Sequence, residues 1–144
     1  MMPLFEQVLD KYPESVKIVF KHYPLSFHKQ ALPAALASMA AAEQGKFWEY
    51  HDELFINQNS LSSEKYLEIA QIMGLDLKKF SLDMMRPSLR QKIEDDTADA
   101  KKAGIIGTPA IFVNGRKLKK RNFSEISRLI DDELADGQNM EIKK

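Results

Sequence analysis

The side chains with the widest chemical range in this chain are three histidines, His22, His28 and His51, the last followed directly by Asp52 and Glu53. Imidazole and carboxylate groups bind zinc and transfer protons near neutral pH. The histidines fall in different predicted elements, however, and no two lie four residues apart, the helical spacing that places two ligands on one face. The sequence therefore predicts no metal site.

Groups for nucleophilic catalysis are also scarce. The chain has no cysteine, and no serine stands in a Gly-x-Ser-x-Gly turn, which holds the nucleophile of many hydrolases. We expect His51 to pack beside Trp48 and Phe55 on a helix, and His22 to lie at the end of a strand. The sequence thus predicts no catalytic residue and no cofactor within these residues.

Strand and turn signals are concentrated between Gly107 and Lys119. The apolar, β-branched segment Ala110–Val113 favours a strand. Asn114-Gly115 favours a tight hairpin turn, because both residue types tolerate positive φ. The sequence therefore predicts a β-hairpin whose second strand covers Arg116–Lys119.

Length and charge restrict the possible classes of function. We assign residues 1–144 to one domain, because a chain of this length can bury its own core. Lys plus Arg and Asp plus Glu both number 21, so no overall charge attracts nucleic acid or anionic lipid. No apolar run reaches the roughly 18 residues of a membrane helix. We see no secretory signal in Met1–Glu6, which lacks the charged-then-apolar layout.

Apolar spacing predicts how the chain begins. Helical spacing starts behind Pro3 and continues to Tyr12, which indicates an amphipathic helix of about three turns. Pro13 ends this helix. The segment Val16–Phe20 is β-branched and apolar, which predicts a strand buried on both faces and therefore a sheet covered by helices.

The middle of the chain, residues 29–103, has a helical pattern throughout. Small residues between Leu32 and Ala40 allow neighbouring helices to approach closely. Capping and periodicity predict further helices, one entered at Ser62 and left at Gly74, and others near 77–84 and 88–103.

A last helix is predicted to begin near Asn122, where Glu125 three residues later suggests a capping box, and to end at Gly137. Residues 138–144 then form a frayed tail. The basic cluster Arg116–Arg121 precedes this helix, and we interpret it as protection of an exposed strand edge rather than as a nucleic-acid site.

Four segments, in this order, carry a resemblance to a known family. They are Val19–Leu25, Gly45–Phe55, Gly74–Asp76 and Gly107–Gly115. Together they resemble the DsbA family of thiol-disulfide oxidoreductases, and the likeness extends over nearly the whole chain. It implies an α/β fold of thioredoxin type, with residues 29–103 as an all-helical insertion.

The resemblance implies a redox centre that this sequence does not contain. In the family, a Cys-x-x-Cys pair lies at the start of the first helix, where the helix dipole lowers the thiol pKa. Pro3 resembles the proline that follows the pair, which would place the cysteines and the first core strand before Met1. Three explanations stay open: a fragment, in one version cut at a selenocysteine codon; a redox-dead peptide-binding paralogue; and a glutathione-dependent transferase or isomerase relative.

The same resemblance assigns a substrate-binding loop to Gly107, Thr108, Pro109 and Ala110. It implies a cis Thr108–Pro109 bond and a backbone edge that an extended peptide can pair with. The implied partners are exported polypeptides and, for the full-length form, a membrane redox protein. The implied location is the periplasm or cell envelope.

Absence of the first core strand has a structural consequence. In the thioredoxin arrangement that strand lies between Val16–Phe20 and Ala110–Val113, and each buried hydrogen bond left unmade costs about 1–3 kcal/mol. We therefore predict that the two flanking strands pair directly, or that a second copy fills the gap as a homodimer or strand-swapped assembly.

Overall fold

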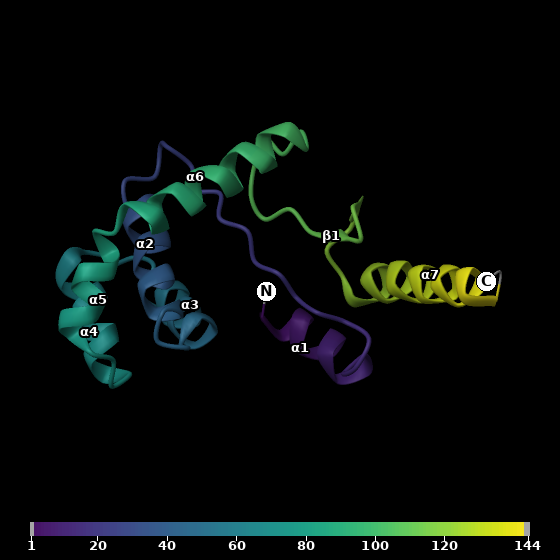
Figure 1. The fold of residues 1–144 in the computed structure, drawn as a ribbon, viewed down its shortest axis with the longest axis horizontal. Coiled ribbons are helices and arrows are strands. Elements are labelled where there is room, and N and C mark those ends of the chain that lie inside the picture. The colour runs from purple at the N-terminus through teal and green to yellow at the C-terminus, as the bar shows by residue number, and fades with distance from the viewer. Residues whose placement is uncertain (1, 143–144) are drawn as a thin grey trace. The chain divides into compact units, whose positions relative to one another are not determined.

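The computed structural model describes residues 2–142 (Figure 1). They form two compact units. Residues 2–19 and 107–142 make up the first, which we call the hairpin unit, and Phe20–Ile106 the second, which we call the helical unit.

The helical unit contains five helices. They are α2 (Ala31–Ala42), α3 (Phe47–Ile56), α4 (Ser63–Ile72), α5 (Leu77–Met84) and α6 (Pro87–Lys102). Helix α2 packs against each of the other four. The small side chains of Ala37, Ala40 and Ala41 are completely buried there, so the predicted close approach of neighbouring helices is confirmed.

Aromatic residues fill the core around α2. Tyr50, Tyr66 and Phe80 are almost completely buried. The Tyr50 hydroxyl donates to the Tyr66 carbonyl oxygen at 2.8 Å, and the Tyr66 hydroxyl donates to Gln30 Oε1 at 2.8 Å. Burial raises the pKa of both phenols, because it disfavours the charged phenolate. These bonds satisfy polar atoms that would otherwise weaken the core.

The helix boundaries follow their capping residues. Ser62 accepts a hydrogen bond from the Lys65 amide at 3.2 Å, and Asp76 accepts one from the Lys79 amide at 2.9 Å. Gly74 has a φ of 71°, the left-handed conformation that commonly closes a helix. The predicted limits of α4 and α5 are therefore confirmed.

The hairpin unit contains α1 (Met2–Lys11), the two short strands β1 (Phe112–Val113) and β2 (Arg116–Lys117), and α7 (Phe123–Ile142). Helix α1 packs against α7, with Val8 and Tyr12 buried among Ile126, Leu129 and Ile130. The Tyr12 hydroxyl donates to Asp131 Oδ1 at 2.6 Å, which lowers the pKa of that carboxyl.

The hairpin has the predicted turn but shorter strands. Phe112 pairs with Lys117 and Val113 with Arg116, in an antiparallel ladder. Asn114 and Gly115 both have positive φ, as a two-residue turn of this kind requires. The Leu118 amide also donates to the Ile111 carbonyl at 2.9 Å, one pair beyond the ladder. The predicted strands, Ala110–Val113 and Arg116–Lys119, are longer than the observed ones, which begin at Phe112 and end at Lys117.

Helix α7 begins where the sequence predicts but continues further. The Asn122 side chain accepts from the Glu125 amide at 2.9 Å. The Glu125 carboxylate does not complete the box with Asn122, because it accepts from the amides of Lys119 and Lys120 at 2.9 and 2.8 Å. The predicted helix end at Gly137 is wrong, because α7 continues to Ile142. The predicted frayed tail is therefore also wrong for residues 138–142. One glycine inside a helix weakens the helix but does not end it. Residues 143–144 lie outside the described residues.

The predicted strand at Val16–Phe20 is wrong. These residues form no strand, and Val19 exposes 66% of its surface. Within the hairpin unit, the described part of the chain holds only the two-stranded sheet of β1 and β2, so the predicted direct pairing of this segment with Ala110–Val113 is also wrong. A strand needs a partner for its backbone groups, and composition alone does not supply one.

Candidate functional site

The loop Gly107–Ala110 connects the helical unit to β1. Thr108 and Pro109 are exposed, while Gly107 and Ala110 are half-buried. The peptide bond between Thr108 and Pro109 is cis. The four residues predicted to bind substrate therefore lie together at the surface, directly before the hairpin.

The backbone of this loop has free hydrogen-bonding groups. Neither its amides nor its carbonyls form a hydrogen bond with another residue in the range 2–142. Strand β1 pairs with β2 on one side, and no described strand lies along its other side. The loop and the free side of β1 therefore present backbone donors and acceptors that no described residue pairs with.

The side chains of the loop offer little chemistry of their own. Thr108 supplies a hydroxyl, and the other three residues supply no ionisable or nucleophilic group. With no cysteine in the chain, the loop has no thiol beside it within these residues. The arrangement can bind backbone, but it cannot by itself carry out acid-base or nucleophilic catalysis.

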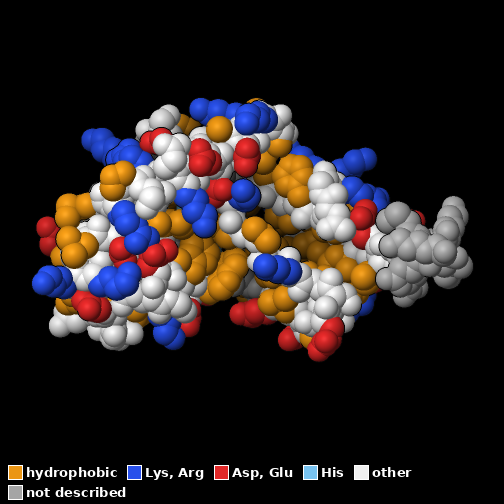
Figure 2. Space-filling model, in the orientation of Figure 1, with side chains coloured by type: hydrophobic (Ala, Val, Ile, Leu, Met, Phe, Trp, Pro, Cys, Tyr) orange, Lys and Arg blue, Asp and Glu red, His pale blue; other side chains and the backbone are white. Residues whose placement is uncertain are grey.

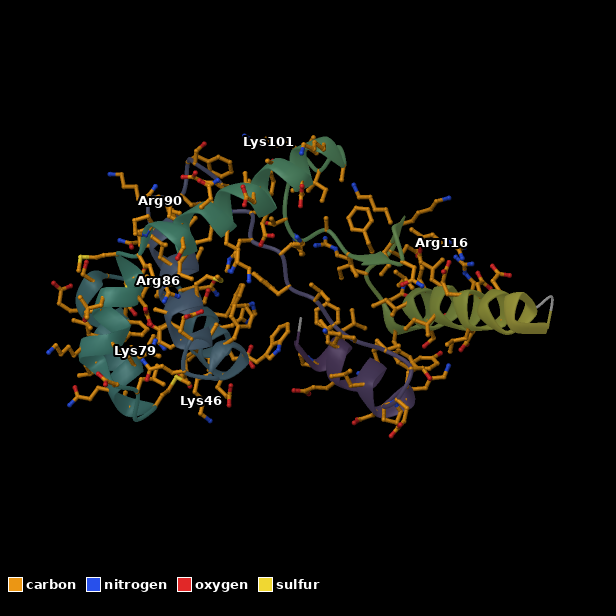
Figure 3. All side chains as sticks on the ribbon, viewed as in Figure 1. Lys46, Lys79, Arg86, Arg90, Lys101 and Arg116 are labelled. Carbon is orange, nitrogen blue, oxygen red and sulfur yellow. The ribbon has the colours of Figure 1, made fainter. Side chains whose placement is uncertain are left out.

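The charges beside the hairpin are partly neutralised. Arg116, labelled in Figure 3, lies 3.3 Å from Glu133 and 3.4 Å from Asp132 on α7. Lys117, Lys119 and Lys120 extend into solvent. Basic and acidic side chains are interspersed over the face drawn in Figure 2. The basic cluster thus lies beside acidic side chains of α7, and its role in protecting a strand edge stays a prediction.

His22 is buried in the helical unit rather than at a strand end. Its backbone amide donates to Asp96 Oδ2 at 3.0 Å, and the neighbouring Lys21 ammonium donates to Asp96 Oδ1 at 2.9 Å. Removal of the imidazole from water lowers its pKa to about 4, against a smaller opposing effect of Asp96. A neutral, buried ring of this kind is a core residue, and not a proton shuttle near pH 7.

His51 packs among aromatic rings, as predicted. Its ring centroid lies 4.9 Å from that of Phe55 and 5.9 Å from that of Trp48. Phe20 approaches it at 5.1 Å. The helical unit therefore presents a partly exposed aromatic surface, formed by Trp48, Phe55 and Phe20. The sequence does not predict this surface.

The histidines do not come together as ligands. Across residues 2–142, no group of three or more His, Asp or Glu side chains lies in an arrangement that could hold a metal ion. In the same range, no helix combines the length and the apolar character that a membrane span requires.

Comparisons with known proteins define the class. A family model described as Thioredoxin matches residues 2–132, so the chain belongs to the thioredoxin family. The crystal structure of a thioredoxin-like oxidoreductase from Silicibacter pomeroyi DSS-3 superposes with a TM-score of 0.78. The two sequences are 27% identical, and the superposition covers 93% of this chain and 77% of the Silicibacter chain.

A second structure defines the type of fold. The oxidoreductase DsbA from Xylella fastidiosa superposes with a TM-score of 0.70 at 20% identity, covering 95% of this chain and 79% of its own. The chain therefore has the DsbA-like form of the thioredoxin fold, with a helical insertion and only a short two-stranded sheet in the described residues. The fold class predicted from the sequence is confirmed.

Curated relatives carry the same stretch inside much longer proteins. The Na(+)/H(+) antiporter NhaA of Herminiimonas arsenicoxydans is 36% identical over 108 residues, which are 75% of this chain and 17% of the antiporter. Antiporter NhaA 3 of Salinispora tropica is 39% identical over 116 residues, 80% of this chain and 18% of that protein. The chain thus spans less than a fifth of the length of these relatives.

Proposed function

We propose that this chain is the substrate-docking part of a DsbA-type thiol-disulfide oxidoreductase that acts on exported polypeptides in the cell envelope. The observation that supports the proposal is the exposed loop Gly107–Ala110, whose backbone groups have no partner among the described residues and which leads into a strand with a free side. Such an edge binds an extended peptide through main-chain hydrogen bonds and is tolerant of its sequence.

The sulfur chemistry of the proposed reaction comes from outside these 144 residues. In disulfide exchange, a thiolate attacks one sulfur of the disulfide, forms a mixed disulfide and releases the other sulfur as a thiolate. This chain has methionine but no cysteine, so it provides no attacking thiolate. Its rate of dithiol oxidation on a reduced, unfolded protein should therefore equal that of buffer.

Peptide binding at the loop can be tested with a labelled, extended peptide and fluorescence polarisation. Thr108→Trp places a large side chain on the exposed loop and should weaken binding about tenfold or more, because it obstructs the backbone edge. Ser124→Trp is the matched control, since Ser124 is also exposed in the hairpin unit but lies in the first turn of α7. Equal affinity of the two variants would remove the loop from the proposed function.

A second candidate is a redox-dead peptide-binding module, which the absence of cysteine favours. Both candidates predict peptide binding at the loop, so binding does not separate them. The coding DNA before Met1 separates the two candidates. If it encodes, in frame, a strand followed by Cys-x-x-Cys or its selenocysteine variant, the oxidoreductase is supported. If it encodes an unrelated sequence, the binding module is supported.

We also propose that a second copy of the chain covers the free side of β1. Unpaired strand edges associate readily, because their amide and carbonyl groups otherwise bond only to water. The resulting homodimer or strand-swapped assembly would form through the same edge that the peptide uses. Peptide and second copy should therefore compete.

A further inference from the structure

A groove of about 720 Å³ lies in the helical unit, between the segment Pro24–Pro33 and helix α6. Its volume is within the range of about 300–1,000 Å³ that is typical of sites for small molecules. All of its lining residues belong to the helical unit, and none belongs to the loop Gly107–Ala110. The groove therefore shares no residue with the proposed peptide site.

One wall of the groove is a single face of α6. Ile93, Thr97 and Lys101 follow one another at intervals of four residues, which places them in one row along the helix. Glu94 and Ala98 form the adjacent row. The regular spacing gives the groove one straight wall with an apolar start at buried Ile93 and a cationic end at Lys101, which is labelled in Figure 3.

The opposite wall comes from the segment before α2 and from the first turn of that helix. Its half-buried part is apolar, and its exposed part is polar: Pro24, Leu25, Leu32 and Pro33 form the first, and Ser26, His28 and Lys29 the second. The Thr97 hydroxyl donates to the Ile93 carbonyl at 2.8 Å, so its hydrogen is already engaged within the helix. The interior of the groove thus suits an apolar chain more than a polar one.

The charges around the groove have an excess of positive sign. Glu94 lies 3.9 Å from Arg90, which partly neutralises it. Neither Lys29 nor Lys101 forms an ion pair with a described residue, and both line the groove. The two ammonium groups therefore favour an anionic ligand over a cationic one.

We propose that this groove binds a small amphiphilic anion, with its apolar chain against Leu25, Leu32 and Ile93 and its carboxylate near Lys29 and Lys101. The apolar walls supply the driving force, because burial of methylene groups removes them from water. The two lysines supply the preference for a negative head group. This site does not depend on the proposed function of the loop.

The proposal can be tested by titration calorimetry of the whole chain with three probes of equal chain length. They are octanoate, octanol and octyltrimethylammonium, each used below the concentration at which it aggregates. Octanoate should bind most tightly and the cation most weakly. Equal binding of octanoate and the cation, or no binding of octanoate, would overturn the proposal.

Variants test the named residues. The double change Lys29→Gln and Lys101→Gln should raise the dissociation constant of octanoate about threefold to tenfold, as expected for two exposed charges. Lys102→Gln is the matched control, because Lys102 is next in sequence but points to Asp99 at 4.0 Å and does not line the groove.

A third variant tests the apolar part. Ala98→Trp fills the groove from the exposed side of α6, so octanoate binding should be lost while the circular dichroism spectrum stays the same. Unchanged octanoate affinity in a folded Ala98→Trp protein would contradict the assignment. So would unchanged affinity in the folded double lysine variant.

Discussion

At the scale of single residues, the imidazole of His22 is a titratable group buried in the described helical unit. It lies against Phe20, with ring centroids 5.0 Å apart, and against Phe47, at 6.0 Å. Asp96 favours its protonation, whereas Lys92, His51 and above all burial oppose it, and its pKa is lowered from 6.5 to about 4. The folded protein therefore binds the His22 proton less readily than the unfolded chain does.

This shift predicts a pH dependence of stability. Below pH 6.5 His22 becomes protonated in the unfolded chain, whereas in the folded protein it becomes protonated only near pH 4. The free energy of unfolding should therefore fall as the pH is lowered through this window, by an amount on the order of 3 kcal/mol. His22→Phe should abolish that part of the slope, as measured by urea unfolding at several pH values.

Phe80→Leu serves as the control for this experiment. Phe80 is completely buried in the same unit but packs against Tyr50 and not against His22, so its replacement should lower stability by a similar amount at every pH. A His22→Phe protein that keeps the full slope of the unchanged protein would show that other groups produce the acid sensitivity.

At the scale of elements, helix α7 depends on hydrogen bonds at its first turn. Asn122 caps the Glu125 amide, while the Glu125 carboxylate holds the two preceding lysine amides, which also lowers the pKa of that carboxyl. The arrangement joins the end of the hairpin to the start of the helix. It fixes the path of the chain between β2 and α7.

Removal of the cap should weaken the hairpin unit. Asn122→Ala is expected to cost about 1 kcal/mol of stability, because the Glu125 amide in the first turn loses its acceptor. Ser124→Ala is the control, since Ser124 is exposed in the same turn and should change stability by less than about 0.5 kcal/mol. Thermal unfolding followed by circular dichroism measures both. A neutral Asn122→Ala variant would refute the role given to this side chain.

The elements also show which features the sequence could predict. Helices α4 and α5 were predictable because their caps, Ser62, Gly74 and Asp76, act within a few residues of their own position. The Asn114-Gly115 turn was predictable for the same reason. The strand at Val16–Phe20 was not, because strand formation depends on a distant partner and not on β-branched residues alone.

The same distinction applies to the candidate sites. The loop Gly107–Ala110 is continuous in sequence, so its glycine, threonine and proline could be recognised through the family resemblance. The groove combines residues 24–33 with residues 93–101, which are brought together only by the packing of α2 and α6. No local pattern marks such a site.

At the scale of the whole molecule, the free side of β1 predicts self-association. If a second copy covers that edge, light scattering after gel filtration should give a mass near twice 16.5 kDa at high concentration. The extended peptide that binds the loop should shift this mass toward that of one chain. A constant single-chain mass at all concentrations would contradict the proposed homodimer, although it would leave peptide binding at the loop intact.

The central claim is that the chain binds an extended peptide at Gly107–Ala110 and performs no sulfur exchange. An amide NMR titration with a disulfide-containing peptide tests both parts in one sample. The account predicts that resonances of residues 107–113 shift as peptide is added, while the peptide disulfide stays intact. Shifts elsewhere with none at residues 107–113, or cleavage of the disulfide by this cysteine-free chain, would contradict it.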